Sequence, residues 1–270
     1  MITAIVLTHN EEEMLLNCLK SIEWVDEILI SDKKSTDSTL AIAQKYNAKI
    51  HHFTGVHFDD WRNQALEKTN GNWAIYIDPD ERITKELKAE IQTILNKNET
   101  SFVKSDLKSA YRMKRINYWW GKKFNCCGAE NDFVTRLFNK SKLKKWRGII
   151  HESPEVDGEI GQLSGEIIHL THRDLISGLK KSYQWTKFEA ELFNQTDHPK
   201  ITWPRLLKIF NQTFWQKFIK QGGIKQGTEG FIESMVQAWN RFMVYEQLWE
   251  LQQKPNLDEK YKEIEEKLSL

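Results

Sequence analysis

Residues 2–13 read ITAIVLTHNEEE, an unbroken apolar run that gives way to polar residues and three glutamates. A short continuous apolar run is typical of a strand buried on both faces of a parallel sheet. We expect Asn10 to cap the helix that follows, with Glu11, Glu12 and Glu13 in its first turn, where the helix dipole favours acidic side chains. This stretch therefore predicts a strand followed directly by a helix, the repeating unit of an α/β fold.

The same alternation continues along the chain. Further strands are expected at residues 27–31, 48–51, 73–77, 111–116, 133–138 and 163–170. Helices are expected after residues 35–38 and from residue 59 or 60, and from residue 174 onward the pattern is helical. This order predicts a doubly wound α/β layer with right-handed crossovers, a mostly parallel sheet between helices, and a C-terminal helical extension.

The composition excludes several classes of protein. The 270 residues include 39 Lys+Arg and 38 Asp+Glu, and 40% are hydrophobic, so a disordered or collagen-like chain is excluded. The balanced charge argues against a protein that coats nucleic acid, and we expect no nucleic-acid partner. Three cysteines, of which Cys126 and Cys127 are adjacent, cannot form a disulfide framework. No signal peptide is recognised, nor an apolar stretch of ~20 residues, and we expect a cytoplasmic protein.

Acidic residues follow three of the expected strands, in residues 8–11 (THNE), at Asp32 and in residues 78–81 (DPDE). Open α/β sheets bind ligands at the carboxyl ends of their strands, and acids that converge there need a cation or hydrogen-bond donors from a ligand. The glycine patterns of dinucleotide-binding and P-loop proteins are absent from the sequence. Although Asp-Pro-Asp is also ordinary turn chemistry, a divalent cation held by carboxylates and substrate phosphates suits these acids.

Several motifs, taken in order, resemble those of family 2 glycosyltransferases of the GT-A fold. They are residues 8–11, Asp32 with residues 35–37 (STD), Arg62-Asn63, residues 71–73 (GNW) and residues 78–81. Asn131-Asp132, residues 136–138 (RLF), His151-Glu152 and His169 resemble the bacterial branch that builds lipopolysaccharide core, which includes β-1,4-glucosyltransferases. The similarity runs from residue 2 to about residue 250. The chain departs from the family pattern at Lys33-Lys34 and at Pro79.

The resemblance implies a binding site for a nucleotide-diphosphate sugar, with a UDP-linked sugar as the expected donor. Asp32 would accept a hydrogen bond from the N3–H of a uracil-like base. Thr8, Asn10 and Glu11 would line the same pocket, Arg62 would meet the nucleotide or its phosphates, and Asp78 would reach the ribose. Asp80 would bind Mg²⁺ or Mn²⁺ on the diphosphate, and His169 is a further candidate ligand.

The resemblance also implies transfer with inversion, which needs a carboxylate to deprotonate the acceptor hydroxyl. We expect Asp132 to be this base, with Glu130 and Glu152 as reserves. Arg136, His151 and Glu152 are expected on the acceptor side. His151-Glu152 is equally compatible with a structural hydrogen-bonded pair. Asp37 is interpreted as a helix cap or a first-turn acid rather than a ligand.

The expected division of the chain follows from these motifs. Residues 1–172 would form the catalytic domain, in which residues 1–100 bind the nucleotide sugar and residues 101–172 form the acceptor side. Residues 173–270 would form a helical region. The expected function is transfer of a hexose to a glycolipid or saccharide acceptor in the synthesis of lipopolysaccharide or a related cell-surface glycan. The alternatives are a non-catalytic carbohydrate- or lipid-binding protein on the same scaffold, and a sugar-nucleotide pyrophosphorylase, whose Gly-rich basic loop is absent here.

The segment from residue 200 to residue 228 contains six Lys or Arg residues and no acid. Its large apolar residues recur at helical spacing, at Trp203, Leu207, Phe210, Phe214 and Phe218. A basic helix with an aromatic stripe is typical of a segment that lies in a membrane interface. We therefore expect peripheral contact with the inner face of the cytoplasmic membrane. The alternative is packing on the catalytic domain or on another subunit, which would make the protein an oligomer.

Overall fold

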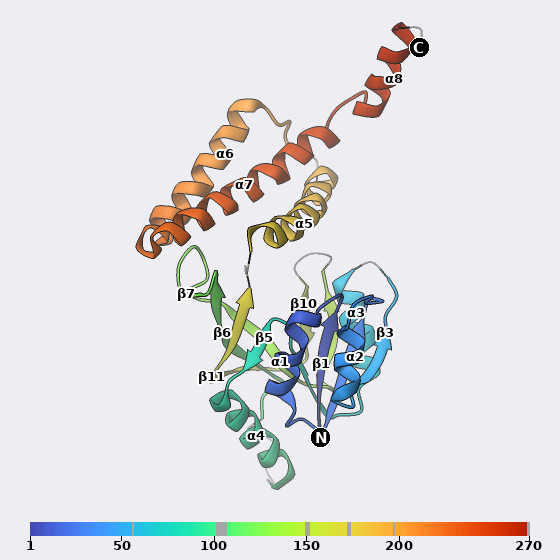
Figure 1. The fold of residues 1–270 in the computed structure, drawn as a ribbon, viewed down its shortest axis with the longest axis vertical. Coiled ribbons are helices and arrows are strands. Elements are labelled where there is room, and N and C mark those ends of the chain that lie inside the picture. The colour runs from blue at the N-terminus through green and yellow to red at the C-terminus, as the bar shows by residue number, and fades with distance from the viewer. Residues whose placement is uncertain (56, 101–106, 149–151, 172–173, 197, 269–270) are drawn as a thin grey trace. The chain divides into compact units, whose positions relative to one another are not determined.

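A computed structural model describes the chain except for residues 56, 101–106, 149–151, 172–173, 197 and 269–270. The chain forms two compact units (Figure 1). The first consists of Met1–Lys123 and Asn131–Thr171, and the second consists of Phe124–Glu130 and His172–Leu270. The short segment Phe124–Glu130 therefore groups with the C-terminal helices, although both of its flanking segments belong to the first unit.

The first half of the first unit is a parallel sheet. Its strands are β1 (Ile2–Thr8), β2 (Glu27–Asp32), β3 (Lys49–His52) and β4 (Trp73–Tyr76), and they pair in the order β3-β2-β1-β4, all parallel. The helices between them are α1 (Glu12–Ile22), α2 (Thr39–Lys45) and α3 (Phe58–Glu67). The alternation predicted from the sequence is confirmed for this half, with element ends that differ by one or two residues.

The second half of the sheet is mixed. Its strands are β5 (Glu81–Ile83), β6 (Ala110–Trp119), β7 (Lys122–Phe124), β8 (Phe133–Asn139) and β11 (Ile160–Thr171). β8 is antiparallel to both β4 and β6, β11 is parallel to β6, and β5 is antiparallel to β11. β9 (Leu143–Arg147) and β10 (Ser153–Val156) form a separate antiparallel pair. Antiparallel neighbours arise here because β8 follows β6 and β7 without the helical crossover that a parallel pair needs.

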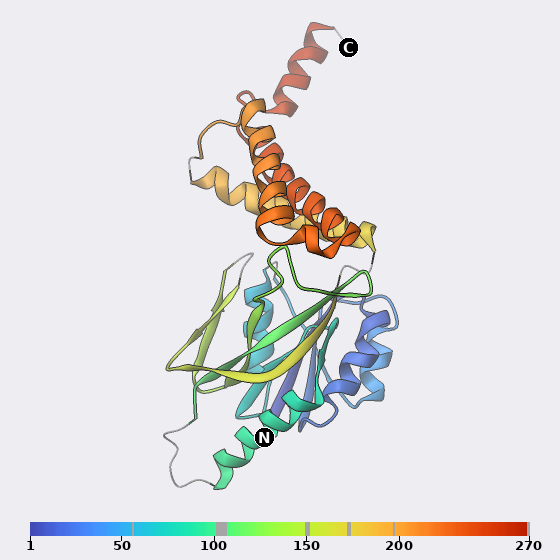
Figure 2. The ribbon, with the colours of Figure 1, turned by 90° about the vertical axis from the view of Figure 1, so that its left-hand side faces the viewer.

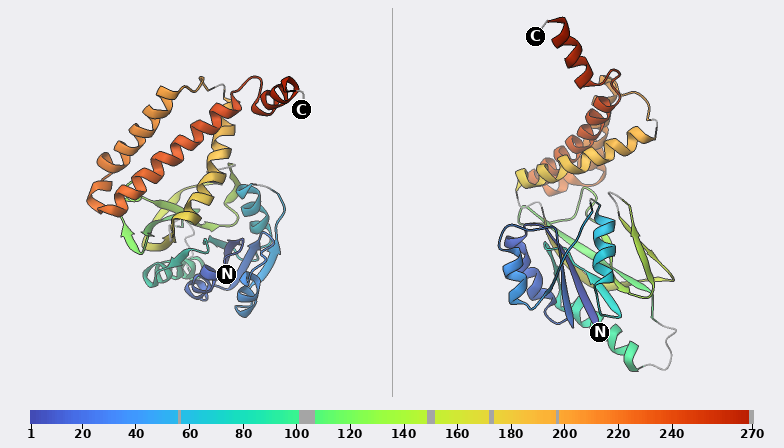
Figure 3. Two further views of the ribbon diagram at one scale, coloured as in Figure 1. Left: turned by 45° about the horizontal axis from the view of Figure 1, so that its top comes forward. Right: turned by 90° about the vertical axis from the view of Figure 1, so that its right-hand side faces the viewer.

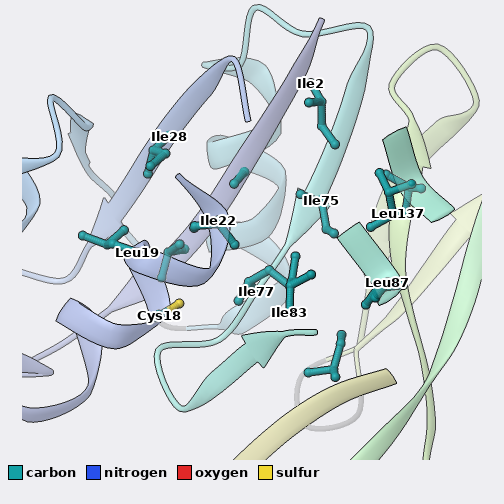
Figure 4. Packing of buried hydrophobic residues seen from close by; sticks show 14 of the residues in the cluster. Ile2, Cys18, Leu19, Ile22, Ile28, Ile75, Ile77, Ile83, Leu87 and Leu137 are labelled. Carbon is teal, nitrogen blue, oxygen red and sulfur yellow. The ribbon is translucent and has the colours of Figure 1, made fainter. Parts of the chain in front are cut away.

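Helices cover both faces of the sheet. Figure 2 shows α1 and α2, in blue, on one face, and the right-hand view of Figure 3 shows the paler α3 on the other. On the first face, residues of α1 such as Leu19 and Ile22 pack against Ile2, Ile28 and Ile75 (Figure 4). This cluster also includes residues of α4 (Lys85–Thr100). Since both faces are buried, the sheet fixes the positions of the side chains at its strand ends.

The second unit is helical. Its elements are α5 (Leu175–Gln195), α6 (Trp203–Trp215), the π-helical turn η2 (Gln216–Lys220), the 3₁₀ helix η3 (Gly223–Gln226), α7 (Thr228–Leu251) and α8 (Leu257–Lys267). α7 packs against both α5 and α6. Gly230 is required where α7 meets η3, because a Cβ there would lie 1.9 Å from the carbonyl oxygen of Gly223. Among the described residues, no helix has the length and apolar character to cross a bilayer.

A buried carboxyl group lies in α7. Glu233 is fully buried, and its Oε1 accepts a hydrogen bond from Gln237 Nε2 at 2.6 Å. Within the described part of the chain, its Oε2 has no hydrogen-bond partner. Burial raises the pKa of Glu233 to about 7 from the 4.5 of an ordinary glutamate. The folded protein therefore holds a proton on this group that the unfolded chain releases between pH 4.5 and 7.

Glu233→Gln is expected to stabilise the helical unit at pH 8 by about 3 kcal/mol. Because the folded pKa is raised, ionisation of Glu233 lowers stability as the pH rises from 4.5 to 7, and a neutral amide removes this loss. At pH 4 the variant and the parent should be equally stable. Denaturant unfolding at both pH values measures the effect, with Glu250→Gln, an exposed position of the same helix, as the control. An equal gain at pH 4 and pH 8, or no gain at pH 8, would contradict the assignment.

Candidate functional site

The first part of the site lies where β1 and β2 end. The register of these parallel strands places Thr8 beside Asp32. Asp32 is fully buried, and its Oδ1 accepts hydrogen bonds from Thr8 Oγ1 (2.9 Å) and from the Ser35 hydroxyl, while Oδ2 accepts one from Ser35 N (2.8 Å). The carboxylate therefore organises the loop after β2. The expected hydrogen bond from a nucleotide base to Asp32 stays a prediction. The Asp32 carboxylate would have to accept it in addition to the three hydrogen bonds that it accepts within the chain.

The expectation that Asn10 caps α1 is wrong. The helix begins at Glu12, and Asn10 adopts a left-handed backbone (φ 56°), which a capping residue does not. Its Oδ1 instead accepts a hydrogen bond from Thr36 N at 2.8 Å. Asp37 accepts from Glu12 N (3.1 Å) and from Thr39 N (3.0 Å), the first residues of α1 and α2, although the N-cap positions themselves are Glu11 and Ser38. These bonds join the loop after β1 to the loop after β2.

Glu11 belongs to the same pair of loops. Its backbone N–H donates to Thr39 Oγ1 at 2.7 Å. Asn10, Glu11, Thr8 and Asp32 are thus brought together, as the expected donor pocket requires. Whether they bind a nucleotide stays a prediction.

Arg62 of α3 is held in a buried ion-pair cluster. Its Nε donates to Glu152 Oε1 at 3.0 Å, and its Nη2 lies 3.7 Å from Asp78 Oδ1. The guanidinium also stacks over the rings of Trp146 (4.8 Å) and Tyr76 (5.5 Å). Glu152, a reserve base, is therefore paired with Arg62. His151, expected beside it, lies outside the described residues.

Asp78 and Glu81 face a second arginine, Arg136 of β8. The Nη2 of Arg136 contacts Asp78 Oδ2 and lies 2.7 Å from Glu81 Oε1. Burial works to raise the pKa of Asp78, but the charges of Arg136 and Arg62 outweigh it and hold this pKa well below its usual range. Arg136, expected on the acceptor side, thus neutralises the acids that follow β4. Removing one partner of such a buried pair leaves an uncompensated charge, which makes this arrangement costly to disturb.

Asp80 faces His169. The register of β5 and β11 pairs Glu81 with His169, and His169 Nε2 lies 3.3 Å from Asp80 Oδ2. His169 Nδ1 lies 2.6 Å from Asn117 Oδ1. Because Asn117 uses its amide NH₂ to donate to Asp132 Oδ2 (2.9 Å), its oxygen faces His169, and His169 Nδ1 must be the donor. In the neutral imidazole, Nε2 then carries a lone pair that faces the Asp80 carboxylate.

Asp80 and His169 fit a divalent cation. An imidazole lone pair opposite a carboxylate oxygen is repulsive unless a cation lies between them or His169 is protonated. A ligating histidine usually donates its other ring N–H to a fixed acceptor, as His169 does to Asn117. In the described part of the chain, no group of three or more His, Cys, Asp or Glu side chains could hold a metal ion. Two protein ligands suit Mg²⁺ or Mn²⁺, which take further oxygen ligands from substrate phosphates and water.

Asp132 lies just before β8, and only one of its two carboxylate oxygens, Oδ2, accepts hydrogen bonds from the described residues. Its Oδ2 accepts from Arg115 Nε (2.8 Å) and from Asn117 Nδ2 (2.9 Å), both from β6. Burial works to raise the pKa of Asp132, but these hydrogen bonds and the Arg115 charge outweigh it and lower the pKa. Asp132 is therefore an oriented carboxylate that is ionised at neutral pH. Glu130, the other reserve base, groups with the helical unit, where it accepts a hydrogen bond from Gly128 N at 2.9 Å.

The contacts form one continuous network across the first unit. Asn117 links Asp132 to His169 and Asp80, and Arg115 links Asp132 to Glu81 at 3.3 Å. Arg115 and Asn117 were not predicted as site residues, because they lie inside β6 and not directly after a strand, where the other candidates were expected. Their two-residue spacing on one face of a strand is a signal that could have drawn attention to them.

Residues 3–154 match the model of the Glycosyl transferase family 2, and the chain belongs to this family. The family inferred from the motifs is thereby confirmed, as is the GT-A α/β fold with a C-terminal helical region. The chain is 27% identical over 274 residues to the lipopolysaccharide core biosynthesis glycosyltransferase LpsC of Rhizobium meliloti, with 96% of each protein covered. It is 26% identical over 253 residues to an uncharacterised glycosyltransferase of Rickettsia conorii, covering 90% of this chain and 87% of that protein.

Two solved structures are also similar. One is Staphylococcus aureus TarS 1–349 in complex with UDP-GlcNAc, at 14% identity and a TM-score of 0.48, covering 92% of this chain and 89% of that one. The other is glucosyl-3-phosphoglycerate synthase of Mycobacterium tuberculosis in complex with Mn²⁺, UDP and glucosyl-3-phosphoglycerate. It has 15% identity and a TM-score of 0.43, and the match covers 74% of this chain and 81% of that one.

Proposed function

We propose that this glycosyltransferase moves a hexose from a nucleotide-diphosphate sugar, expected to be UDP-linked, to a glycolipid or saccharide acceptor with inversion. The observation that carries the proposal is the network at the carboxyl end of the sheet, in which Asn117 joins the Asp80–His169 pair to Asp132. Similarity to LpsC over nearly the whole chain supports lipopolysaccharide core or a related cell-surface glycan as the product. The family match argues against the pyrophosphorylase alternative.

The donor would bind across the ends of β1, β2 and β4. The loops held together by Asp32 and Asp37 would take the base, and Asp78 would meet the ribose. Arg62 and Arg136 hold Asp78 ionised and in place, so that it can accept hydrogen bonds from ribose hydroxyls. Asp80 and His169 would hold Mg²⁺ or Mn²⁺, which when bound neutralises charge on the diphosphate leaving group. Asn117 fixes the histidine tautomer that leaves Nε2 free to coordinate.

The acceptor hydroxyl would be deprotonated by Asp132. Arg115 and Asn117 both bind Oδ2 and so orient the carboxylate, leaving Oδ1 for the acceptor hydroxyl. The acceptor oxygen forms the new bond to the anomeric carbon, its proton moves to Asp132, and the nucleoside diphosphate leaves on the opposite face. Glu152 is less suited to this role because its Oε1 already accepts from Arg62 Nε, and Glu130 already accepts a hydrogen bond from Gly128 N. Localisation at the inner face of the cytoplasmic membrane is part of the proposal, because a lipid-linked acceptor would lie there.

The test is release of a nucleoside diphosphate from a panel of nucleotide sugars, with and without divalent metal. Release that requires both metal and one particular sugar would support the proposal. A protein that binds a nucleotide sugar without ever turning it over would instead match the non-catalytic alternative.

A further inference from the structure

Residues 200–228 present a row of exposed apolar side chains that is interrupted once, by the exposed Asn211. The row follows every fourth residue of α6 and η2, which places its members on one inclined ridge. Trp203 is 73% exposed, Leu207 52%, Trp215 54% and Ile219 48%. We call these four residues the outer ridge. Two exposed tryptophans on one ridge are unusual in a surface helix of a soluble domain, where exposed apolar residues are scattered singly.

Other aromatic residues of the same segment are used for packing. Phe214 and Phe218 stack on each other at 5.3 Å, and both contact Phe231 of α7 at 5.7 Å. Leu206 and Ile209 pack against the small core that includes Val244 and Leu248. The stripe expected from the sequence is therefore divided. Phe214 and Phe218 help to hold α6 and η2 on α7, and the left-hand view of Figure 3 shows α6 and α7 side by side. The outer ridge remains exposed.

Basic residues accompany the outer ridge. Lys208 and Lys220 are exposed on α6 and η2, and Lys225 is exposed on η3. Lys217 differs, because its Nζ donates to the carbonyl oxygen of Cys127 at 2.8 Å and so has a structural role. No acidic residue occurs from 200 to 228, and the exposed acids Glu246 and Glu250 belong to the end of α7 that packs beside the start of α6. The segment thus combines exposed tryptophans with exposed basic residues and contains no acid of its own.

We propose that the outer ridge, with Lys208, Lys220 and Lys225, docks on an anionic lipid surface. Tryptophan side chains settle at the level of lipid headgroups, and cations near an anionic leaflet are attracted to it. A second copy of the chain fits this surface less well, because a twofold interface would bring the same lysines together. Lysine is also depleted at the centres of protein interfaces. The inference extends the proposed function by naming where a lipid-linked acceptor would be met, but vesicle binding itself does not depend on catalysis.

Co-sedimentation of the full chain with vesicles tests the proposal. The parent should bind vesicles that contain phosphatidylglycerol and bind pure phosphatidylcholine weakly. The triple variant Lys208→Gln, Lys220→Gln, Lys225→Gln should lose roughly 100-fold in binding, at about fivefold for each cation removed. The matched control is Lys20→Gln, Lys45→Gln, Lys85→Gln, which makes the same charge change at exposed positions of the first unit. This control should bind like the parent.

A second variant tests the apolar contribution. Trp203→Ser with Trp215→Ser should weaken binding to anionic vesicles while leaving the helical circular dichroism unchanged, because both side chains are exposed. Failure of the parent to bind anionic vesicles would overturn the proposal, as would equal losses in the two lysine variants. A parent that ignores vesicles but forms a dimer that the tryptophan variant dissociates would assign the ridge to a subunit contact. Docking would stand if the parent binds vesicles yet releases no nucleoside diphosphate, and the proposed function alone would then fail.

Discussion

Asp80→Asn is expected to lower hexosyl transfer on the order of 10³-fold, the loss typical when a group that stabilises transition-state charge is removed. Asparagine keeps the size of the side chain but loses the charge that would hold a cation against the diphosphate. The fold should survive, because the Asp80 side chain is partly exposed and its backbone carbonyl still accepts from Leu170 N at 2.8 Å. Steady-state transfer rates and melting temperatures of variant and parent measure the two effects.

A chelator should reproduce the loss in the unmutated enzyme, and added Mn²⁺ or Mg²⁺ should restore the activity. Asp157→Asn is the matched control, because this carboxylate is exposed on the same unit and lies 3.8 Å from Lys142, its ion-pair partner. The Asp157→Asn variant should transfer hexose at the rate of the unmutated enzyme. Undiminished transfer by Asp80→Asn, or by the parent in excess chelator, would remove Asp80 from the role of metal ligand.

Asp132→Asn is expected to lower kcat by ~10²–10⁴-fold, the usual loss of a general base, with donor affinity little changed. The amide cannot take the proton of the acceptor hydroxyl, although it can still meet Arg115 and Asn117. Because the pKa of Asp132 is lowered, its ionisation should not limit the rate between pH 5 and 8. Pre-steady-state transfer and nucleotide-sugar binding, measured on the same preparation, separate the two effects.

Glu152→Gln and Glu130→Gln provide the comparison for this prediction. Glu152→Gln should affect binding or stability more than kcat, because it breaks the pair with Arg62. Glu130→Gln should be close to silent. If Asp132→Asn transfers as fast as the parent while Glu152→Gln does not, the base is Glu152 and the proposed role of Asp132 is wrong.

The parallel half of the fold could be predicted from local sequence. Buried parallel strands are continuous apolar runs, and the helices between them show apolar residues at helical spacing, so both signals lie within short windows. The positions of Asp32, Asp78 and Asp80 at strand ends could be predicted for the same reason, because a rule about strand ends needs only the strands. The left-handed backbone of Asn10 was not predicted. Its side chain accepts a hydrogen bond from Thr36 in another loop, and the sequence around Asn10 does not reveal this partner.

The rest of the site depends on contacts between distant segments. Asn117 matters because β6 lies beside both β8 and β11, which places it between Asp132 and His169. That strand order combines parallel and antiparallel neighbours and leaves no periodic trace in the sequence. The grouping of Phe124–Glu130 with the C-terminal helices likewise rests on long-range contacts, such as Cys127 N donating to the carbonyl oxygen of Gln221 at 2.8 Å.

The decisive measurement for metal-dependent hexosyl transfer by this chain is release of a nucleoside diphosphate. The purified chain would be incubated with a panel of UDP-, GDP-, ADP- and dTDP-linked sugars, each with Mn²⁺, with Mg²⁺ or with excess chelator. We expect release from a UDP-hexose in the presence of metal, none in chelator, and a strong loss in both Asp80→Asn and Asp132→Asn. Release that persists in chelator, or that both variants support at the parent rate, would show that Asp80 and Asp132 do not have the proposed roles.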